Sequence, residues 1–198
     1  MSSFTKKAIE ASFLKLLNEA PLSHITVKMI VDDCRINCNS FYYHFQDIYD
    51  LLEWTLAEDS RHLLESKIKL GDWQKSIAAL FDYMQENRLL ILNAFHSLER
   101  DTLEKEVFNV LSPLLFELFK AQPNFELLND EDQKFIVNMY GLGITGLLLR
   151  WIATDMLTPP DPLIRQLYRL VGGSLDGIIQ RFLATADTPI ELLDRQRH

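Results

Sequence analysis

The chain has 198 residues, of which 47% are hydrophobic and 24% charged, with seven glycines and seven prolines. This length and composition are typical of a folded helical protein and exclude collagen-like and low-complexity chains. Twenty basic residues stand against 28 acidic ones, which gives a net charge of -8. This charge argues against a nucleic-acid partner held by bulk electrostatic attraction, because phosphate neutralisation requires a basic surface.

The sequence also restricts the compartment. No apolar run approaches the roughly 18 residues that cross a membrane, and the N-terminal residues lack the apolar core of a signal peptide. The two cysteines, Cys34 and Cys38, are too few for a disulfide framework and fit a reducing compartment. We therefore expect a cytoplasmic protein without a membrane contact.

The first 46 residues predict three helices. Apolar residues recur at helical spacing from Ile9 up to Pro21, which predicts the first helix. Thr26 can cap a second helix of about two turns that ends near Asp33. After a tight turn, Asn37 can cap a third helix that runs from 38 to 45.

Six further helices follow, at positions marked by caps, acidic residues and prolines. Their expected ranges are 47–71, 73–86, 89–98, 101–121 with a kink at Pro113, 129–156 and 161–184, with Asp72 as a cap and a loop at 122–128. The fold class is therefore all-α, with roughly nine helices and no strand. We divide the chain into an N-terminal unit at 1–46 and a helical domain at 47–198.

The second and third helices have the lengths and the connecting turn of a helix-turn-helix. The apolar residues expected to lock them together are Ile30, Ile36, Phe41 and Phe45. Segment 25–54, and above all Ser40-Phe-Tyr-Tyr-His-Phe45, resembles the N-terminal signature of the TetR/AcrR transcriptional regulators. Segments 51–54, 93–98 and 146–152 are similar to the DhaS-like branch of that family.

The resemblance implies a homodimer that pairs through its last two helices and places two N-terminal units in successive major grooves of double-stranded operator DNA. It also implies that the C-terminal domain binds a small-molecule effector. We therefore expect a transcriptional repressor. In it, an effector would tilt the helix that begins at Asp47 and change the separation of the two reading helices.

The side chains expected to contact DNA lie in the second and third helices. Thr26 and Lys28 offer a hydroxyl and an ammonium group to a phosphate. An Asn amide can pair bidentately with adenine, and the side chains that would face base edges are Cys38, Asn39, Ser40 and Tyr42. The resemblance places Tyr43 and His44 at phosphates. Each of these residues also has a simpler interpretation as a turn or packing residue.

Two residues depart from the family pattern. Arg35 stands where the family usually has glycine in the turn, so the turn either avoids a positive φ or tolerates strain. Ile48 replaces a basic residue that is common at the start of the fourth helix, which removes a phosphate contact. Residues 1–54 carry five basic and seven acidic groups, so affinity for DNA should be modest and weakly salt-dependent.

This acidic balance keeps a second function open, that of a TetR-like coactivator or scaffold that acts through a protein partner and has little operator affinity. We expect no enzyme, because motifs for metal-dependent hydrolysis, phosphate binding and an activated nucleophile are missing. We also expect no metal or other cofactor, since Cys34 and Cys38 would need two more ligands for zinc. A redox role of these two cysteines stays open.

Polar residues within apolar surroundings mark a candidate effector cavity in the C-terminal domain. They are Tyr83, Asn93, His96 and Asn138. The alternative is that they are satisfied polar groups of the core or of the dimer face. Three glycines on or near one helix face, Gly141, Gly143 and Gly146, predict close approach of a neighbouring helix.

Overall fold

The computed structural model describes residues 2–66 and 73–185. In these two ranges the chain forms nine α-helices and no strand, which confirms the all-α fold class. The helices are α1 (Ser2–Glu19), α2 (Val27–Asp33), α3 (Cys38–Tyr42), α4 (Ile48–Ser66), α5 (Trp73–Glu86), α6 (Arg88–Ser97), α7 (Arg100–Lys120), α8 (Asp130–Ile152) and α9 (Asp161–Thr185), with short 3-10 turns at Leu22–His24 and Phe125–Leu127.

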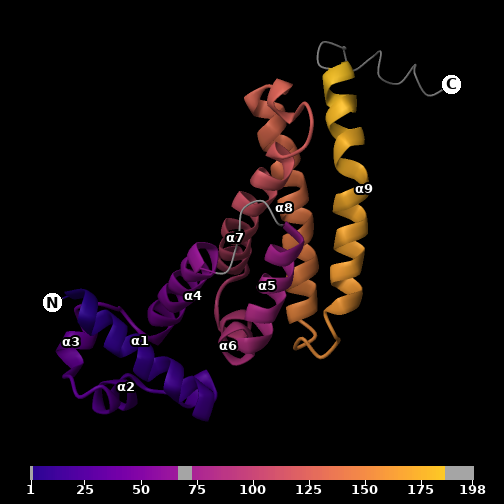
Figure 1. Cartoon of the computed structure of the whole chain (residues 1–198). Helices are drawn as coiled ribbons and strands as arrows, with labels where there is room; N and C mark the ends of the chain where they lie inside the picture. The colour runs from indigo at the N-terminus through magenta and orange to yellow at the C-terminus, as the bar shows by residue number, and fades with distance from the viewer. Residues whose placement is uncertain (1, 67–72, 186–198) are drawn as a thin grey trace.

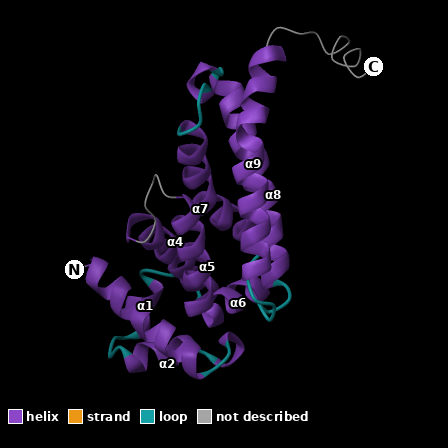
Figure 2. Ribbon diagram, turned by 45° about the vertical axis from the view of Figure 1, so that its right-hand side comes forward, coloured by secondary structure: helices purple, strands orange, loops and turns teal. Residues whose placement is uncertain are grey.

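Helices α1–α3 lie together at one end of the molecule, and α4 leads from them into a larger bundle (Figure 1). In that bundle α7 and α8 pack along each other more extensively than any other pair. Helix α9 runs alongside α8, as Figure 2 also shows. The buried apolar residues form one continuous cluster from α1 to α9, because α4 contributes to the core of both parts.

Local chemistry sets the predicted helix starts. The side chains of Thr26, Asn37 and Asn129 accept hydrogen bonds from the first-turn amides of α2, α3 and α8. Asp47 Oδ1 accepts from the amides of Tyr49 and Asp50 at 2.8 and 2.9 Å, ahead of α4. Each bond satisfies an amide that has no partner inside its own helix. The predicted caps at these four positions are therefore confirmed.

The turn between α2 and α3 resolves the question raised by Arg35. Its φ is 55°, the left-handed conformation. The Arg35 amide donates to Asp32 O at 3.4 Å, and the Ile36 amide donates to Val31 O at 3.0 Å. These two bonds form a Schellman motif, whose left-handed position usually carries glycine. The turn therefore keeps the positive φ, and Arg35 tolerates the strain.

Two helix ends differ from the predicted ones. Helix α3 ends at Tyr42 instead of Phe45, although one further helical turn of backbone hydrogen bonds continues to Phe45. Helix α8 ends at Ile152 instead of Met156, because a second Schellman motif follows it, with the Asp155 and Met156 amides bonded to Ile152 O and Trp151 O. Left-handed residues cannot continue a right-handed helix.

Three further expectations have separate outcomes. Pro113 lies inside α7 without ending it, and the loop at 122–128 contains the 3-10 turn Phe125–Leu127. The helix end at Gly71 and the cap at Asp72 lie outside the described residues.

The three glycines of α8 do not share one role. A Cβ atom on Gly141 would lie 2.7 Å from Phe108 Cε2, whereas a Cβ on Gly143 or Gly146 would meet no atom within 4 Å. Gly141 therefore permits the close approach of α7 that the sequence predicts. Gly143 and Gly146 face outward in the single chain, so close approach of a helix from a second copy at these two glycines stays a prediction.

Helix α8 is also long and apolar enough to cross a membrane by length and composition alone. However, 56% of that apolar window is buried inside the bundle. The core helix of a soluble protein has the same property, and we interpret α8 in that way.

Candidate nucleic-acid interface

Helix α3 is anchored by apolar residues on its inner side. Phe41 is fully buried and lies 5.8 Å from Phe45, ring centre to ring centre. Ile30 of α2 is also fully buried, and its carbonyl accepts a hydrogen bond from the buried Ser12 hydroxyl of α1 at 3.2 Å. Because α1, α2 and α3 are held together in this way, the outer face of α3 has a fixed orientation.

The outer face presents most of the side chains expected at DNA. Cys38 and Asn39 are exposed, Tyr42 is 57% exposed and Tyr43 is 81% exposed. Ser40 and His44 are half-buried. Large exposed aromatic side chains beside an exposed amide are typical of a surface that contacts another molecule.

Part of this face is hollowed. An open hollow of about 320 Å³ is lined by Thr5, Asn37, Asn39, Ser40, Tyr43 and His44. The structure thus brings together four of the eight predicted side chains. Cys38 and Tyr42 lie on the same helix outside the hollow, and Thr26 and Lys28 are exposed at the start of α2.

Two lining residues were not predicted as contacts. Asn37 was assigned only as a cap, and its Oδ1 accepts from the Ser40 amide at 2.8 Å and from the Ser40 hydroxyl at 3.1 Å. The Ser40 hydroxyl proton is therefore committed to the cap, and only its lone pairs remain for DNA. Thr5 comes from α1, 32 residues before Asn37, and no local pattern in the sequence links the two.

Several basic groups of the N-terminal unit are already engaged. Lys6 Nζ lies 5.0 Å from the ring centre of Phe45 and 4.7 Å from that of Trp54, which places it in a cation–π contact. Lys15 pairs with Asp33. The exposed cations that remain are Lys7, Lys28 and Arg35. The Lys15 charge is offset by Asp33, whereas Lys6 keeps its charge but is held against the two rings.

Cys34 and Cys38 differ in their surroundings. Cys34 is half-buried, and burial raises the pKa of its thiol above the ordinary value. A higher pKa leaves less thiolate and lowers reactivity. Cys38 is exposed at the start of α3.

The four residues expected to line an effector cavity do not come together. Asn93 Oδ1 accepts from the Leu22 amide at 3.1 Å, so this side chain joins α6 to the N-terminal unit. His96 is exposed, 3.3 Å from the Asp155 carboxylate, and Asn138 is exposed on α8. The structure therefore does not bring these three residues into one cavity, because polar positions on neighbouring helices can face different partners.

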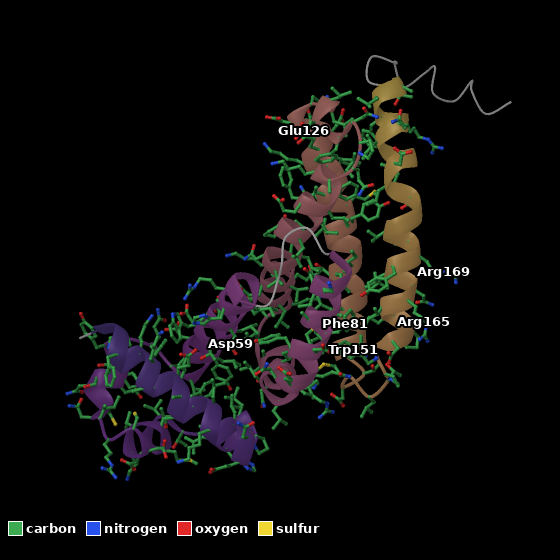
Figure 3. The ribbon with its side chains drawn as sticks, viewed as in Figure 1. Asp59, Phe81, Glu126, Trp151, Arg165 and Arg169 are labelled. Carbon is green, nitrogen blue, oxygen red and sulfur yellow. The ribbon has the colours of Figure 1, made fainter. Side chains whose placement is uncertain are left out.

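Of the four expected residues, Tyr83 is the one that lines an apolar cavity in the bundle. The cavity has a volume of about 60 Å³ and lies among α4–α8. The Tyr83 hydroxyl donates to Asp59 Oδ2 at 3.2 Å, and burial raises the pKa of both groups. Asp59 lies on α4 (Figure 3). The charged residue of the lining is Glu106, whose pKa burial also raises, and no sequence pattern singles it out.

Comparisons with known proteins agree with this architecture. A family model described as a transcriptional regulator C-terminal region of the TetR type matches residues 71–173, slightly more than half of the chain. A solved structure of the dihydroxyacetone kinase operon activator DhaS matches with a TM-score of 0.67 and 21% identity, over 86% of this chain and 96% of that one. At this identity the likeness concerns the fold alone.

A curated relative adds sequence similarity. The chain is 28% identical over 94 residues to the HTH-type dhaKLM operon transcriptional activator DhaS of Lactococcus lactis subsp. lactis (strain IL1403). The match covers 48% of this chain, and it spans half the length of that relative. The family match shows that this chain belongs to the TetR family of transcriptional regulators.

Proposed function

We propose that the protein is a cytoplasmic, homodimeric regulator that binds operator DNA through α3. The observation that carries this proposal is the outer face of α3, where Asn39, Tyr42 and Tyr43 are exposed while Phe41 behind them is fully buried. Exposed aromatic rings contribute no free energy of burial to folding, so their position on this face favours a partner that covers them.

The chemistry of this face fits a major groove. The Asn39 amide can pair with an adenine edge, and the Tyr42 ring and the Cys38 thiol can contact bases. Tyr43 and His44, whose rings lie 4.9 Å apart, can donate hydrogen bonds to phosphates, as can Thr26 and Lys28. With few free cations, binding should depend on groove contacts and on dimer spacing more than on salt.

Dimerisation would use the outer faces of α8 and α9. Phe135, Met139, Leu142 and Gly146 form one exposed apolar stripe along α8, at helical spacing. A second copy packed on this stripe would bury it and set the distance between two α3 helices. Two half-sites about 34–36 Å apart would match that arrangement.

The proposal also includes regulation by an effector that binds in the C-terminal domain. The cavity beside Tyr83 has a volume of about 60 Å³, whereas ligand sites usually measure about 300–1,000 Å³. An effector that binds there must therefore open the bundle. Since α4 belongs to both parts, opening would tilt α4 and change the α3 separation.

The sign of regulation, activation or repression, is a separate part of the proposal. The sequence led us to expect a repressor, but the curated relative and the protein of the solved structure are each named as an operon activator. This favours activation over repression, and a reporter gene placed behind the bound site measures the sign.

The test is a gel shift with a DNA site selected from random sequence at a fixed salt concentration. Asn39→Ala and Tyr42→Ala should each lower affinity by about 10- to 100-fold, since a base contact contributes about 1–3 kcal/mol. Asn109→Ala removes an exposed amide from α7 and serves as the matched control. Unchanged affinity in both α3 variants, with the dimer intact, would overturn the proposed docking.

A second function is favoured by one observation. Residues 1–54 carry two more acidic than basic groups, and Lys6 and Lys15 have partners inside the protein. A coactivator or scaffold that acts through a protein partner would tolerate such a surface. Failure of the unmodified protein to select any DNA sequence at low salt would support this alternative.

A further inference from the structure

The cavity beside Tyr83 has an apolar floor. Every described lining residue that is buried carries an apolar side chain, among them Leu80 of α5, Ile91 of α6 and Leu148 of α8. Such side chains cannot offset the cost of removing a charge or a hydrogen-bonding group from water. A ligand must therefore place an apolar part on this floor.

The edge of the cavity differs from its floor. The half-buried lining residues include three polar ones, Ser60 of α4, Tyr83 of α5 and Glu106 of α7. The Tyr83 hydroxyl already donates to Asp59 Oδ2 at 3.2 Å. Among the lining residues that the structure describes, Glu106 carries a negative charge and none carries a positive one. The carboxylate thus borders an apolar floor, and the described lining supplies no counter-charge.

The negative charge of Glu106 is unfavourably placed. Burial raises the pKa of its carboxyl above the ordinary value, while the neighbouring Lys105 lowers that pKa and Glu53 of α4 raises it further. Lys105 is exposed, so water and salt screen its charge. Burial also raises the pKa of Asp59, the partner of Tyr83. A positive charge brought in by a ligand would stabilise the Glu106 carboxylate, whereas a negative one would repel it.

We propose that Glu106 makes this cavity a site for small primary alkylammonium ions. The carbon chain of such an ion lies on the apolar floor, and its ammonium group donates hydrogen bonds to the Glu106 carboxylate. Because Glu106 is only half-buried at the edge, the ammonium group keeps part of its hydration and loses less solvation free energy than a fully buried charge. Glu106 is therefore the residue that determines specificity.

The size of the cavity restricts the length of the carbon chain. Its volume is about 60 Å³, whereas an apolar cavity of about 150 Å³ holds benzene. The floor therefore accepts about two to four carbon atoms without rearrangement. Longer ions of the same class would have to open the bundle. The regulatory meaning of this inference rests on the proposed function, since it names the chemical class of the effector, but the binding itself does not.

The test measures binding of n-butylammonium, 1-butanol and butyrate to the full-length protein without DNA. The three probes have similar carbon chains and differ in charge. The Met84 methyl resonance reports on the cavity, because Met84 is a buried lining residue, and the Met29 methyl group, exposed on α2, is the internal reference. At about pH 8, where an alkylammonium stays protonated, n-butylammonium should shift the Met84 resonance saturably. Its affinity should be about ten-fold higher than that of 1-butanol, and butyrate should give no shift.

A pair of variants isolates the carboxylate. Glu106→Gln keeps the size of the side chain and removes its charge, so it should lower the affinity for n-butylammonium by about ten-fold and leave that for 1-butanol unchanged. Glu99→Gln removes an exposed carboxylate directly before α7 and should change neither affinity. The comparison of the three probes on the unmodified protein holds even if one of these variants does not fold.

Three results would overturn the proposal. The first is the absence of a saturable Met84 shift with n-butylammonium. The second is binding of 1-butanol or butyrate to the unmodified protein as tightly as n-butylammonium. The third is an equal loss of n-butylammonium affinity in Glu106→Gln and Glu99→Gln, which would indicate attraction by the overall negative charge.

The experiment also separates this inference from the proposed function. If n-butylammonium binds as expected but the unmodified protein selects no DNA sequence, the proposed function fails and the alkylammonium site stands. If the protein selects DNA and n-butylammonium does not bind, the alkylammonium site fails and the docking of α3 stands.

Discussion

At the scale of single residues, Arg35 shows how a backbone requirement and a side chain can disagree. The Schellman motif between α2 and α3 needs a left-handed residue, and the chain supplies arginine at φ 55°. The left-handed conformation costs an L-residue about 1–2 kcal/mol. Since the motif also seats buried residues on both sides of the turn, the surrounding packing enforces the conformation.

Arg35→Gly should therefore stabilise the protein. Glycine removes the left-handed cost but adds about 0.5–1 kcal/mol of backbone entropy, so we expect a net gain of about 0.5–1 kcal/mol in the free energy of unfolding. Urea denaturation with an unchanged m-value measures it. Arg35→Ala, which removes the same side chain but keeps the strain, should show no such gain, and an equal gain in both variants would refute the explanation.

At the scale of elements, α8 has two faces that a count of its glycines does not separate. Gly141 is buried against Phe108 of α7, and Leu115 Cδ1 would lie 3.6 Å from an added Cβ. Gly143, two residues later, has open space at the same position. Both residues pay the same entropic penalty of glycine in a helix, so only their surroundings distinguish them.

Substitutions of Gly141 and Gly143 test the α7–α8 contact within one helix. Gly143→Ala should raise the free energy of unfolding by about 1 kcal/mol, the intrinsic gain of alanine over glycine. Gly141→Ala should lower it by about 1–3 kcal/mol, because the new methyl group forces the Phe108 ring to move. Thermal or urea unfolding measures both values. Similar effects of the two substitutions would mean that the α7–α8 contact is looser than the structure indicates.

At the scale of the whole molecule, the exposed apolar residues are not evenly distributed. The α8 stripe faces outward beside α9 and consists of Phe135, Met139, Leu142 and Gly146. Arg165 and Arg169 lie on the exposed side of α9 (Figure 3). A stable protein interface buries about 800 Å² on each partner. The stripe and the neighbouring surface of α9 offer a continuous place for a second copy.

Leu142→Arg should convert the proposed dimer to a monomer. Leu142 is 60% exposed in the single chain, so arginine should cost the monomer little, whereas at an interface it would bury an unpaired charge. Light scattering after gel filtration measures the mass. Leu157→Arg, at a 77% exposed position in the α8–α9 loop, should remain dimeric. A dimeric Leu142→Arg protein would contradict an interface at the stripe.

Local signals in the sequence determined the helices and the reading surface. The caps at Thr26, Asn37, Asp47 and Asn129 act within a few residues, so their bonds could be predicted from the residues alone. The alternation of buried Phe41 with exposed Tyr42 and Tyr43 follows in the same way from helical spacing. These features depend on neighbours along the chain.

The remaining features depend on segments that meet only after folding. Thr5 lines the hollow at α3, Asn93 bonds to Leu22 of the N-terminal unit, and Arg88 bonds to Asp155, 67 residues away. A polar side chain on an amphipathic helix takes whichever partner the packed neighbour offers. The sequence by itself therefore determined where α2, α3, α4 and α8 begin and which α3 residues are exposed, while only the tertiary structure decided which distant residues are joined.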